Sequence, residues 1–255
     1  IDAGVITGAT SITSTAFVGN LTGTVATATQ NSITTATGLT AVGAANTLTT
    51  VAGIPFYQGD TGSIYTHDVS GTDDTATKNT AFGITAMDAI TTGDNNTAIG
   101  HGAMGANTTG LAATAVGSSA LKTNTTANFN VAVGYESLAL TTTGGHNTAV
   151  GTTAMYANTT GAHNTALGYG ALLANTTGTR NLAIGFGAYD ASDTENDNLA
   201  IGYNAMTTNT AGGTANVALG NYALDALTSG DSNTALGKDS LSANNTGGSN
   251  TAVGR

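Results

Sequence analysis

Residues 147–163 read Asn-Thr-Ala-Val-Gly-Thr-Thr-Ala-Met-Tyr-Ala-Asn-Thr-Thr-Gly-Ala-His, and the units on either side keep this plan. The glycine of the Thr-Ala-Val-Gly segment recurs with a 17-residue period, broken by a single interval of 18. A short fixed period means that each unit is one small element, which buries its apolar side only by stacking on its neighbours. The chain is therefore predicted to be a repeat array that forms a solenoid. The recurring glycines are Gly83, Gly100, Gly117, Gly134, Gly151, Gly168, Gly185, Gly202, Gly220, Gly237 and Gly254.

Each unit contains a strand signal and a turn signal. Thr-Ala-Val-Gly and its variants have the alternation and the β-branched content of a short, half-buried strand. Asn-Thr-Thr-Gly favours a turn, because asparagine and glycine tolerate positive φ and threonine forms local hydrogen bonds. Coils stacked at about 4.8 Å give an array roughly 50 Å long. We therefore predict an all-β fold, a parallel β-solenoid of 17-residue repeats.

Two apolar columns recur through the units, and both are expected to form the core. An alanine precedes the first column in every copy, from Ala81 to Ala252, which indicates close packing at that position. The first column is Phe82, Ile99, Val116, Val133, Val150, Leu167, Ile184, Ile201, Leu219, Leu236 and Val253. The second column, four residues after the glycine, is Met87, Met104, Leu121, Leu138, Met155, Leu172, Tyr189, Met206, Leu224 and Leu241.

The period also divides the chain. Residues 1–51 share the Thr/Ala/Gly vocabulary without the repeat and are expected to form an extended fibre shaft. Residues 52–78 contain the single proline, Pro55, and are expected to be a connector. Residues 79–255 make up ten full coils and a partial eleventh, and the interval of 18 is expected to bulge at a turn without shifting either apolar column. Because the chain begins at Ile1 and stops at Arg255, just after an eleventh strand segment, it is interpreted as a piece of a longer protein.

Composition excludes several classes of function. Five basic residues against 15 acidic ones give a net charge of -10, which disfavours nucleic acid and anionic membranes as partners. The absence of cysteine removes disulfides, thiolate metal sites and cysteine nucleophiles. No apolar run approaches the roughly 20 residues of a membrane-spanning helix. The four histidines have no recognisable nucleophile and base around them, so no enzymatic activity is expected.

The repeat resembles a known family. Asn164-Thr165-Ala166-Leu167-Gly168, followed by Asn175-Thr176-Thr177-Gly178, is similar to the head repeats of trimeric (YadA-like) autotransporter adhesins and to related arrays in phage tail fibres. The resemblance covers residues 79–255 and implies a left-handed β-roll that assembles as a homotrimer. The 17-residue coil is longer than the family's best-known coils, and no translocating anchor is present. Residues 17–28, Phe-Val-Gly-Asn-Leu-Thr-Gly-Thr-Val-Ala-Thr-Ala, resemble fibre proteins of marine T4-like phages.

These observations lead to three functional hypotheses. The first is a structural tail fibre of a virion, a homotrimer that positions a receptor-binding tip and contacts other fibre or baseplate proteins and a host-surface glycan. The second is a trimeric adhesin on a bacterial cell surface. The third is an ice-binding solenoid, because Thr108, Thr159 and Thr176 recur as a regular threonine array. Trimer formation is also favoured on energetic grounds. Burial of two large apolar side chains in each coil returns less free energy than the conformational entropy lost when the whole coil is ordered, so contact with other chains is expected to supply further burial.

Two groups of side chains are candidate metal ligands, although no cofactor is otherwise expected. His146 and His163 occupy the same coil position and are followed there by Arg180 and Asp197, so all four are expected to form a surface column; in a trimer, histidines that faced the axis could bind a transition metal. The alternative is a row of solvated turn residues with an Arg180–Asp197 ion pair. The acidic turn with Asp190, Asp193, Glu195 and Asp197 is rich in oxygen ligands and could hold Ca²⁺; the alternative is a divergent exposed turn.

Four aromatic residues follow the strand glycine: Tyr135, Tyr169, Phe186 and Tyr203. Three of them fall in consecutive units and predict a stacked ladder that could receive the sugar rings of a receptor glycan. The alternative is packing within the chain or contact between subunits. The formal glycosylation sequons at 107–109, 158–160 and 175–177 are interpreted as turns.

Overall fold

The computed structural model describes residues 50–51, 54–55, 57–58, 63–66, 75–209 and 212–255. The chain divides into two units, 1–44 and 45–255. The first unit, which holds most of the expected fibre shaft at 1–51, lies outside the described residues. None of the described segments forms a helix that is long and apolar enough to span a membrane.

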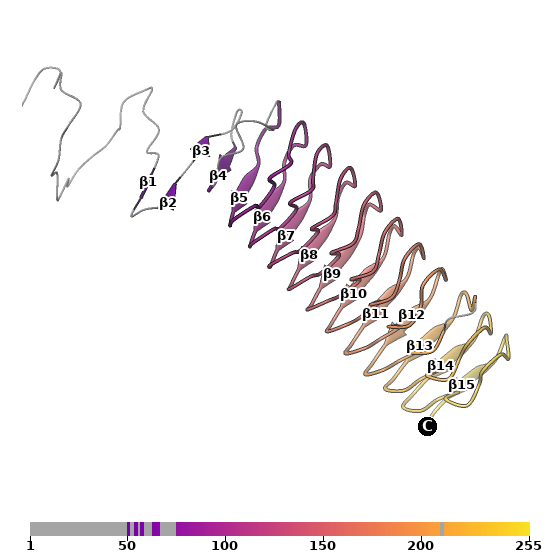
Figure 1. Cartoon of the computed structure of the whole chain (residues 1–255). Coiled ribbons are helices and arrows are strands. Elements are labelled where there is room, and N and C mark those ends of the chain that lie inside the picture. The colour runs from indigo at the N-terminus through magenta and orange to yellow at the C-terminus, as the bar shows by residue number, and fades with distance from the viewer. Residues whose placement is uncertain (1–49, 52–53, 56, 59–62, 67–74, 210–211) are drawn as a thin grey trace, which may run out of the picture. The chain divides into compact units, whose positions relative to one another are not determined.

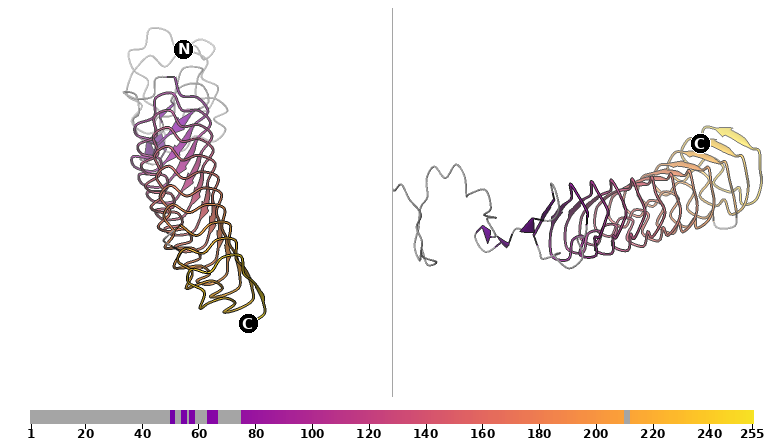
Figure 2. Two further views of the ribbon diagram at one scale, coloured as in Figure 1. Left: turned by 90° about the vertical axis from the view of Figure 1, so that its right-hand side faces the viewer. Right: turned by 90° about the horizontal axis from the view of Figure 1, so that it is seen from above.

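The second unit contains a parallel β-solenoid, as the repeat predicts (Figure 1). Each coil contributes one three-residue strand, and neighbouring strands pair in parallel, with Thr148 opposite Thr165, Ala149 opposite Ala166 and Val150 opposite Leu167. Figure 2 shows the coils following one another along one axis. The strands that carry the repeat are β5 (Thr80–Phe82), β6 (Thr97–Ile99), β7 (Thr114–Val116), β8 (Val131–Val133), β9 (Thr148–Val150), β10 (Thr165–Leu167), β11 (Leu182–Ile184), β12 (Leu199–Ile201), β13 (Val217–Leu219), β14 (Thr234–Leu236) and β15 (Thr251–Val253).

The parallel ladder begins before the first full repeat unit, within the segment expected to be a connector. β4 pairs in parallel with β5, with Ile64 opposite Thr80. β3 pairs antiparallel with β4 and covers the edge of the sheet, while β1 and β2 form a separate antiparallel pair. These short strands are β1 (Thr50–Val51), β2 (Ile54–Pro55), β3 (Tyr57–Gln58) and β4 (Ile64–Tyr65).

The early start of the ladder has a local explanation. The Ser63 hydroxyl accepts a hydrogen bond from the Asn79 N–H at 3.0 Å, which is the role that an asparagine side chain has in later coils. Tyr65 is fully buried at the position where later strands carry alanine. Because Ser-Ile-Tyr replaces Asn-Thr-Ala, and the step from Ser63 to Asn79 is shorter than the repeat, the sequence period does not reveal this strand.

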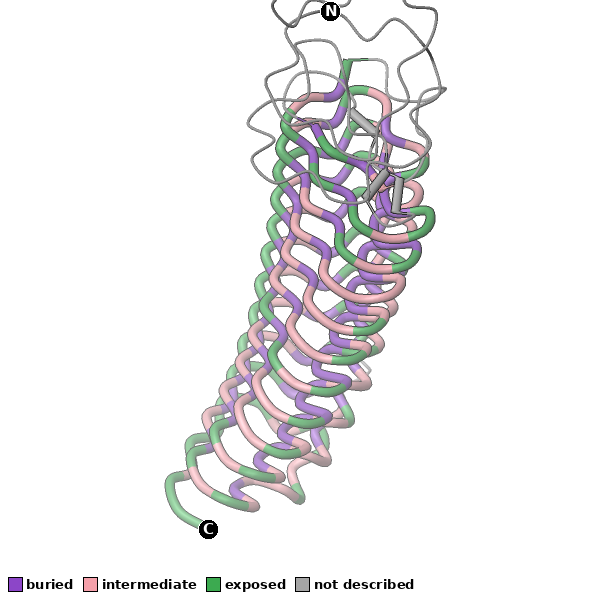
Figure 3. Tube along the Cα trace, turned by 90° about the vertical axis from the view of Figure 1, so that its left-hand side faces the viewer, coloured by how far each residue is buried: buried purple, intermediate pink, exposed green. Residues whose placement is uncertain are grey.

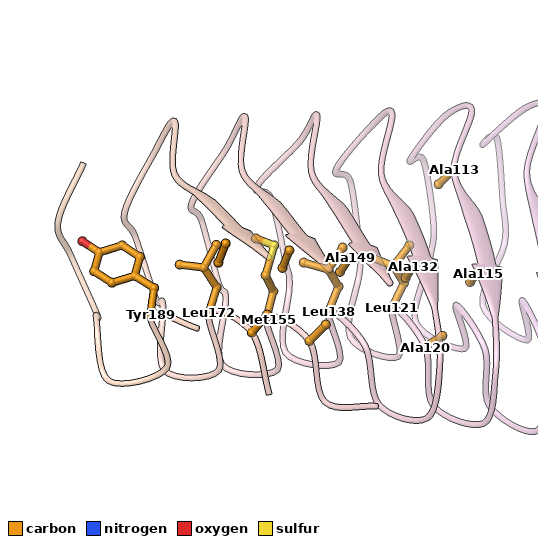
Figure 4. Packing of buried hydrophobic residues seen from close by; sticks show 14 of the residues in the cluster. Ala113, Ala115, Ala120, Leu121, Ala132, Leu138, Ala149, Met155, Leu172 and Tyr189 are labelled. Carbon is orange, nitrogen blue, oxygen red and sulfur yellow. The ribbon is translucent and has the colours of Figure 1, made fainter. Parts of the chain in front are cut away.

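The core of each coil pairs a strand alanine with one large side chain from the opposite wall. The strand alanines from Ala81 to Ala235 are at most 1% exposed, and the second apolar column is fully buried from Met87 to Leu224. Figure 4 shows Leu138, Met155 and their counterparts in a row, one in each coil. In Figure 3 the buried positions recur at the same point of successive coils, so the core runs along the whole stack.

The expectation that the first apolar column also belongs to the core is wrong. In β10 the side chains alternate exposed, buried, exposed, and Leu167 remains 46% exposed. A strand of three residues can turn either its alanine or its two larger residues inward, since neighbours point to opposite faces. The narrow interior is already filled from the other wall, so alanine lies inside and the larger apolar side chain lies outside.

The second apolar column reaches the core through a strained backbone. Ala171 and Leu172 are adjacent and both fully buried, which an extended chain does not allow. Leu172 has φ 53°, in the left-handed region, and Met155 and Tyr189 share this conformation. That conformation costs a non-glycine residue about 1–2 kcal/mol. Burial of a large apolar side chain returns about 1.5–3 kcal/mol and offsets the strain.

The strand glycines are required by close approach between coils. Gly134 has φ +133°, and a Cβ placed there would lie 2.5 Å from the carbonyl oxygen of Gly151 in the next coil. A side chain at this position therefore collides with backbone, and the left-handed φ adds strain. This is the physical reason that the period is visible as a column of glycines.

A ladder of buried asparagines joins successive coils. The Asn164 N–H donates to Asn147 Oδ1 at 2.9 Å, and Asn164 Oδ1 accepts from the Asn181 N–H at 2.8 Å. Asn164 Nδ2 donates to the carbonyl of Gly178 at 2.7 Å and so gives this buried carbonyl oxygen of the turn a hydrogen-bond partner. The ladder is interrupted at Ala113. Its members are Asn79, Asn96, Asn130, Asn147, Asn164, Asn181, Asn198, Asn216 and Asn233.

The single interval of 18 is absorbed in a turn, as expected. The Gly213 N–H reaches Asn209 Oδ1 across four residues, whereas the Gly110 N–H reaches Asn107 Oδ1 across three. Strand pairing on either side keeps Ala200 opposite its alanine counterpart in β13. The extra residue therefore lies between Asn209 and Gly213 and shifts neither column.

Overpacking tests the inward position of the strand alanines. Ala166→Leu should lower the free energy of unfolding by at least about 1–3 kcal/mol, because the interior has no room for three more carbon atoms. Thr177→Ser, on an exposed turn, is the matched control. Equal chemical-denaturation midpoints for the two variants would mean that the alanine column is not buried.

Reciprocal substitutions test the asparagine ladder. Asn164→Ala leaves the buried Asn181 N–H without its acceptor and removes the shorter of the two hydrogen bonds to the Gly178 carbonyl, so the unfolding free energy should fall by about 1–3 kcal/mol. Ala113→Asn, at the one interruption, should raise it by completing the ladder. Both changes are measured by chemical denaturation against the unsubstituted chain. A neutral Asn164→Ala would show that water replaces the ladder at no cost.

Candidate functional site: the outer face of the sheet

The outer face of the sheet presents a continuous apolar column. Every strand from β5 to β15 turns its third residue outward, and this residue is apolar in all of them. Ile99 is 42% exposed and Leu219 is 40% exposed. We call this set of first-column residues the outer apolar column. A contiguous exposed apolar surface of this kind is typical of contact sites.

The apolar surface is widest over β11, β12 and β13. Most strands begin with threonine on the outer face, but these three neighbouring strands begin with Leu182, Leu199 and Val217; β8, which begins with Val131, stands apart from them. Each of these residues lies beside a member of the outer apolar column in the same strand. The face is therefore two apolar residues wide in this part of the array and one residue wide over most of the other strands.

Two further columns flank the strands and form the margins of the outer face. The residue just before the ladder asparagine position forms the leading margin, and the residue just after the strand glycine forms the trailing margin. The leading margin is Lys78, Asn95, Ala112, Phe129, His146, His163, Arg180, Asp197, Ala215, Ser232 and Ser249. The trailing margin is Ile84, His101, Ser118, Tyr135, Thr152, Tyr169, Phe186, Tyr203, Asn221, Lys238 and Arg255.

The leading margin stacks its side chains along the array, as the period predicts. The His146 and His163 rings lie 4.9 Å apart and 10° from parallel, and Phe129 stacks on His146 at 4.9 Å. Arg180 Nε donates to Asp197 Oδ1 at 2.6 Å, and Arg180 Nη2 donates to Oδ2 at 2.8 Å. This hydrogen-bonded guanidinium lowers the pKa of the Asp197 carboxyl. The expected Arg180–Asp197 pair is confirmed.

Within one chain, His146 and His163 are not arranged to chelate a common metal ion. Imidazole lone pairs lie in the ring plane, so two nearly parallel rings, such as those of His146 and His163, do not point at a common ion. In the described part of the chain, no three His, Cys, Asp or Glu side chains come together as a metal site. The stacking instead joins neighbouring coils.

The acidic turn folds around one buried carboxylate. Glu195 is 2% exposed. Its Oε2 accepts from the Ser192 hydroxyl at 2.9 Å and from the Asp193 and Thr194 N–H groups at 3.1 Å each. Its Oε1 accepts from the Gly212 N–H at 3.0 Å. Glu195 thus caps the turn that asparagine and glycine form in other coils, and its oxygens are occupied by protein donors.

Tyr189 completes this variant coil. It occupies the second apolar column in place of leucine or methionine, and its phenol oxygen accepts hydrogen bonds from the side-chain amides of Asn198 and Asn209. Burial raises the pKa of the Tyr189 phenol, so the hydroxyl stays neutral at physiological pH. The sequence predicts that this residue lies in the core, but it does not predict that its hydroxyl binds two asparagine side chains.

The trailing margin carries the aromatic ladder. Tyr169 and Phe186 stack at 5.0 Å and 11°, and Phe186 and Tyr203 stack at 5.4 Å and 12°. The ring of Phe186 is 50% exposed, but both of its faces are turned to neighbouring rings. A sugar stacks on a ring face, so the middle of the ladder offers ring edges rather than a sugar platform. Tyr135 lies two coils away from this stack, between Ser118 and Thr152.

A hollow of about 290 Å³ lies beside the trailing margin. It forms where Gly102 and Gly105 supply no side chain, and its rim includes Asp88, His101 and Lys122. The sequence does not predict the hollow, because each of the two glycines is also explained by a turn.

The threonine array divides into two columns. The Thr108 and Thr159 hydroxyls donate to carbonyl oxygens of the next coil at 3.0 Å. These hydroxyls are therefore used in hydrogen bonds between the turns of neighbouring coils. The following threonines, such as Thr109 and Thr160, are exposed.

No protein-family model, no curated protein and no solved structure matches this chain.

The role of Glu195 as a turn cap is tested by substitution and by calcium. Glu195→Ala should lower the unfolding free energy by about 3 kcal/mol, because four donors lose an anionic acceptor. Asp193→Ala, at an exposed site in the same turn, is the control and should change stability little. Adding Ca²⁺ or a chelator should leave the thermal midpoint of the unsubstituted chain unchanged. A midpoint that rises with Ca²⁺ would restore the calcium hypothesis.

Proposed function

We propose that this chain is a non-enzymatic structural segment of a fibre, in which parallel copies assemble as a homotrimer through the outer apolar column. The observation that carries the proposal is the unbroken row of outward-facing apolar side chains, exposed or half-buried, along one face of a regular stack. A rigid stack of coils with such a face suits a spacer, because it keeps its length and presents the same contact in every coil.

The energetics favour burial of this face. An apolar side chain that stays half exposed contributes about 1 kcal/mol less stabilising free energy than one that is fully buried. The same deficit recurs at nearly every coil, for example at Ile99, Leu167 and Leu236. Covering the column with an identical column needs no second protein, and parallel chains keep matching coils at the same height. The trimer is the state that the likeness to adhesin heads and phage fibres implies.

Two settings fit such a fibre. The resemblance of residues 17–28 to phage fibre proteins favours a virion tail fibre that positions a receptor-binding part near its host, in contact with other fibre or baseplate proteins. A trimeric adhesin on a bacterial surface is the second candidate, carried by the likeness of the 79–255 repeats to adhesin heads. Immunogold labelling of intact virions with antibodies against the array distinguishes them, since an adhesin would label cells instead.

Sedimentation equilibrium of the full chain tests the assembly. The unsubstituted chain should sediment at three times the chain mass. Ile201→Asp places a charge in the widest part of the apolar face. Because an unpaired charge is costly to bury, the dissociation constant of the trimer should rise at least tenfold. Thr177→Asp, on an exposed turn, should leave the mass unchanged. A folded monomer at all concentrations of the unsubstituted chain would refute the proposal.

A further inference from the structure

The outer apolar column by itself does not define how neighbouring chains align. Every coil offers valine, leucine, isoleucine or phenylalanine at the same position, so sliding one chain by a coil replaces one apolar contact with a similar one. A homotrimeric fibre with a single structure needs a feature that differs from coil to coil. The two margins of the outer face are such a feature, because their residues break the repeat.

In four of the eleven coils, a large or charged residue on the leading margin accompanies an aromatic ring on the trailing margin; Lys78 with Ile84, Asn95 with His101 and His146 with Thr152 do not follow this pattern. Where the leading margin carries Phe129, His163, Arg180 or Asp197, the trailing margin of the same coil carries an aromatic ring. Where the leading residue is alanine or serine, the trailing residue is polar or aliphatic. The matched aromatic coils are Phe129 with Tyr135, His163 with Tyr169, Arg180 with Phe186, and Asp197 with Tyr203; the other coils include Ala112 with Ser118, Ala215 with Asn221, and Ser232 with Lys238.

Contacts within one chain do not explain this coincidence. Arg180 and Phe186 are six residues apart, at opposite ends of β11, a separation of about 20 Å if the segment is extended. Their contacts run along the stack instead: Arg180 pairs with Asp197, and Phe186 stacks with Tyr169 and Tyr203. The two margins meet only if another copy brings them together.

Resting on the proposed trimer, we propose that the leading margin of one copy packs against the trailing margin of the next, coil for coil, and that this contact fixes the register of the fibre. A rotation about an axis parallel to the stack leaves every coil at its own height. Three sheet faces turned towards such an axis therefore bring the leading margin of each chain to the trailing margin of its neighbour. The occupant of this surface is a second copy of the same chain.

The matched residues are chemically complementary across this contact. The aliphatic stem of Arg180 packs against the exposed edge of the Phe186 ring of the neighbouring copy, because Tyr169 and Tyr203 cover the two faces of that ring. The Asp197 carboxylate accepts a hydrogen bond from the Tyr203 phenol. Phe129 meets Tyr135 as an aromatic pair.

A shift by one coil removes this complementarity at Asp197 and Phe129, whereas Arg180 faces an aromatic ring in either shifted register. In one direction Asp197 faces the apolar ring of Phe186, and in the other it faces Asn221. Phe129 then faces Ser118 or Thr152 instead of a ring. Burying a carboxylate against an apolar ring is unfavourable, so the margins act against wrong registers as well as for the right one.

Disulfide trapping tests the contact directly, because the chain contains no cysteine of its own. The double variant His146→Cys/Thr152→Cys places one thiol on each margin of the same coil; it removes the His146 ring from its stack but leaves the residues of the four matched aromatic coils unchanged. After oxidation, most of the chain should shift from the one-chain band to a three-chain band on a non-reducing gel, because each copy links to both neighbours. Ala112→Cys/Ser118→Cys is a second pair of this kind in another coil.

The matched control is Ala112→Cys/Thr152→Cys, whose thiols are two coils out of register. An axial offset of about 10 Å exceeds the about 7 Å that a disulfide spans between Cα atoms, so this variant should stay as single chains. Each variant is first sedimented under reducing conditions, which reports the assembly state independently.

The outcomes separate the register from the assembly. Trimers that link through neither in-register pair would overturn the margin contact and leave the proposed fibre standing, and efficient linking of the offset control would overturn the register. Monomers of the unsubstituted chain would overturn both. A covalent two-chain product from the in-register pairs would support the margin contact and contradict the trimer.

Discussion

The rest of the structure depends on the width of the coil interior. One large side chain from the second apolar column, such as Leu172, fills the space between the two walls and leaves room on the strand side for alanine. Interiors at native packing density admit neither a void nor an extra methylene at low cost. The strand must therefore turn Ala166 inward and Leu167 outward. This requirement creates the outer apolar column, so the packing inside one chain determines the surface that it offers to another.

A thin solenoid also has to provide hydrogen-bond partners for many polar groups that lie close to its core. The asparagine ladder does so by linking each coil to the next through both the backbone and the side chain of Asn164 and its equivalents. At two places another polar group takes the role: the Ser63 hydroxyl before the first full coil and Glu195 in the acidic turn, whereas at Ala113 no side chain does. These replacements show that the fold keeps the position of the hydrogen bond rather than the residue type.

The sequence predicts the parts of the structure that repeat. The glycine period gives the parallel solenoid, the Thr-Ala-Val alternation gives the strands, and the interval of 18 falls in the turn after Asn209. It does not give the direction in which a three-residue strand faces, because Ala166 inside and Leu167 inside fit the same alternation. The left-handed backbone of Leu172 also carries no signal, since bulky residues rarely adopt it. Non-repeating features, such as the capping role of Glu195, appear in the sequence only as interruptions.

In the proposed fibre, each strand has two separate roles. The alanine and the second column hold one chain together, while the outward residues are free to define assembly. The most direct test of this separation is the electron paramagnetic resonance spectrum of a nitroxide attached at Val150→Cys, in the middle of the outer apolar column. We predict strong dipolar broadening from close labels on neighbouring copies and restricted label motion. A sharp spectrum of a mobile, isolated label in the folded protein would contradict the account, because the column would then face solvent in the assembled state.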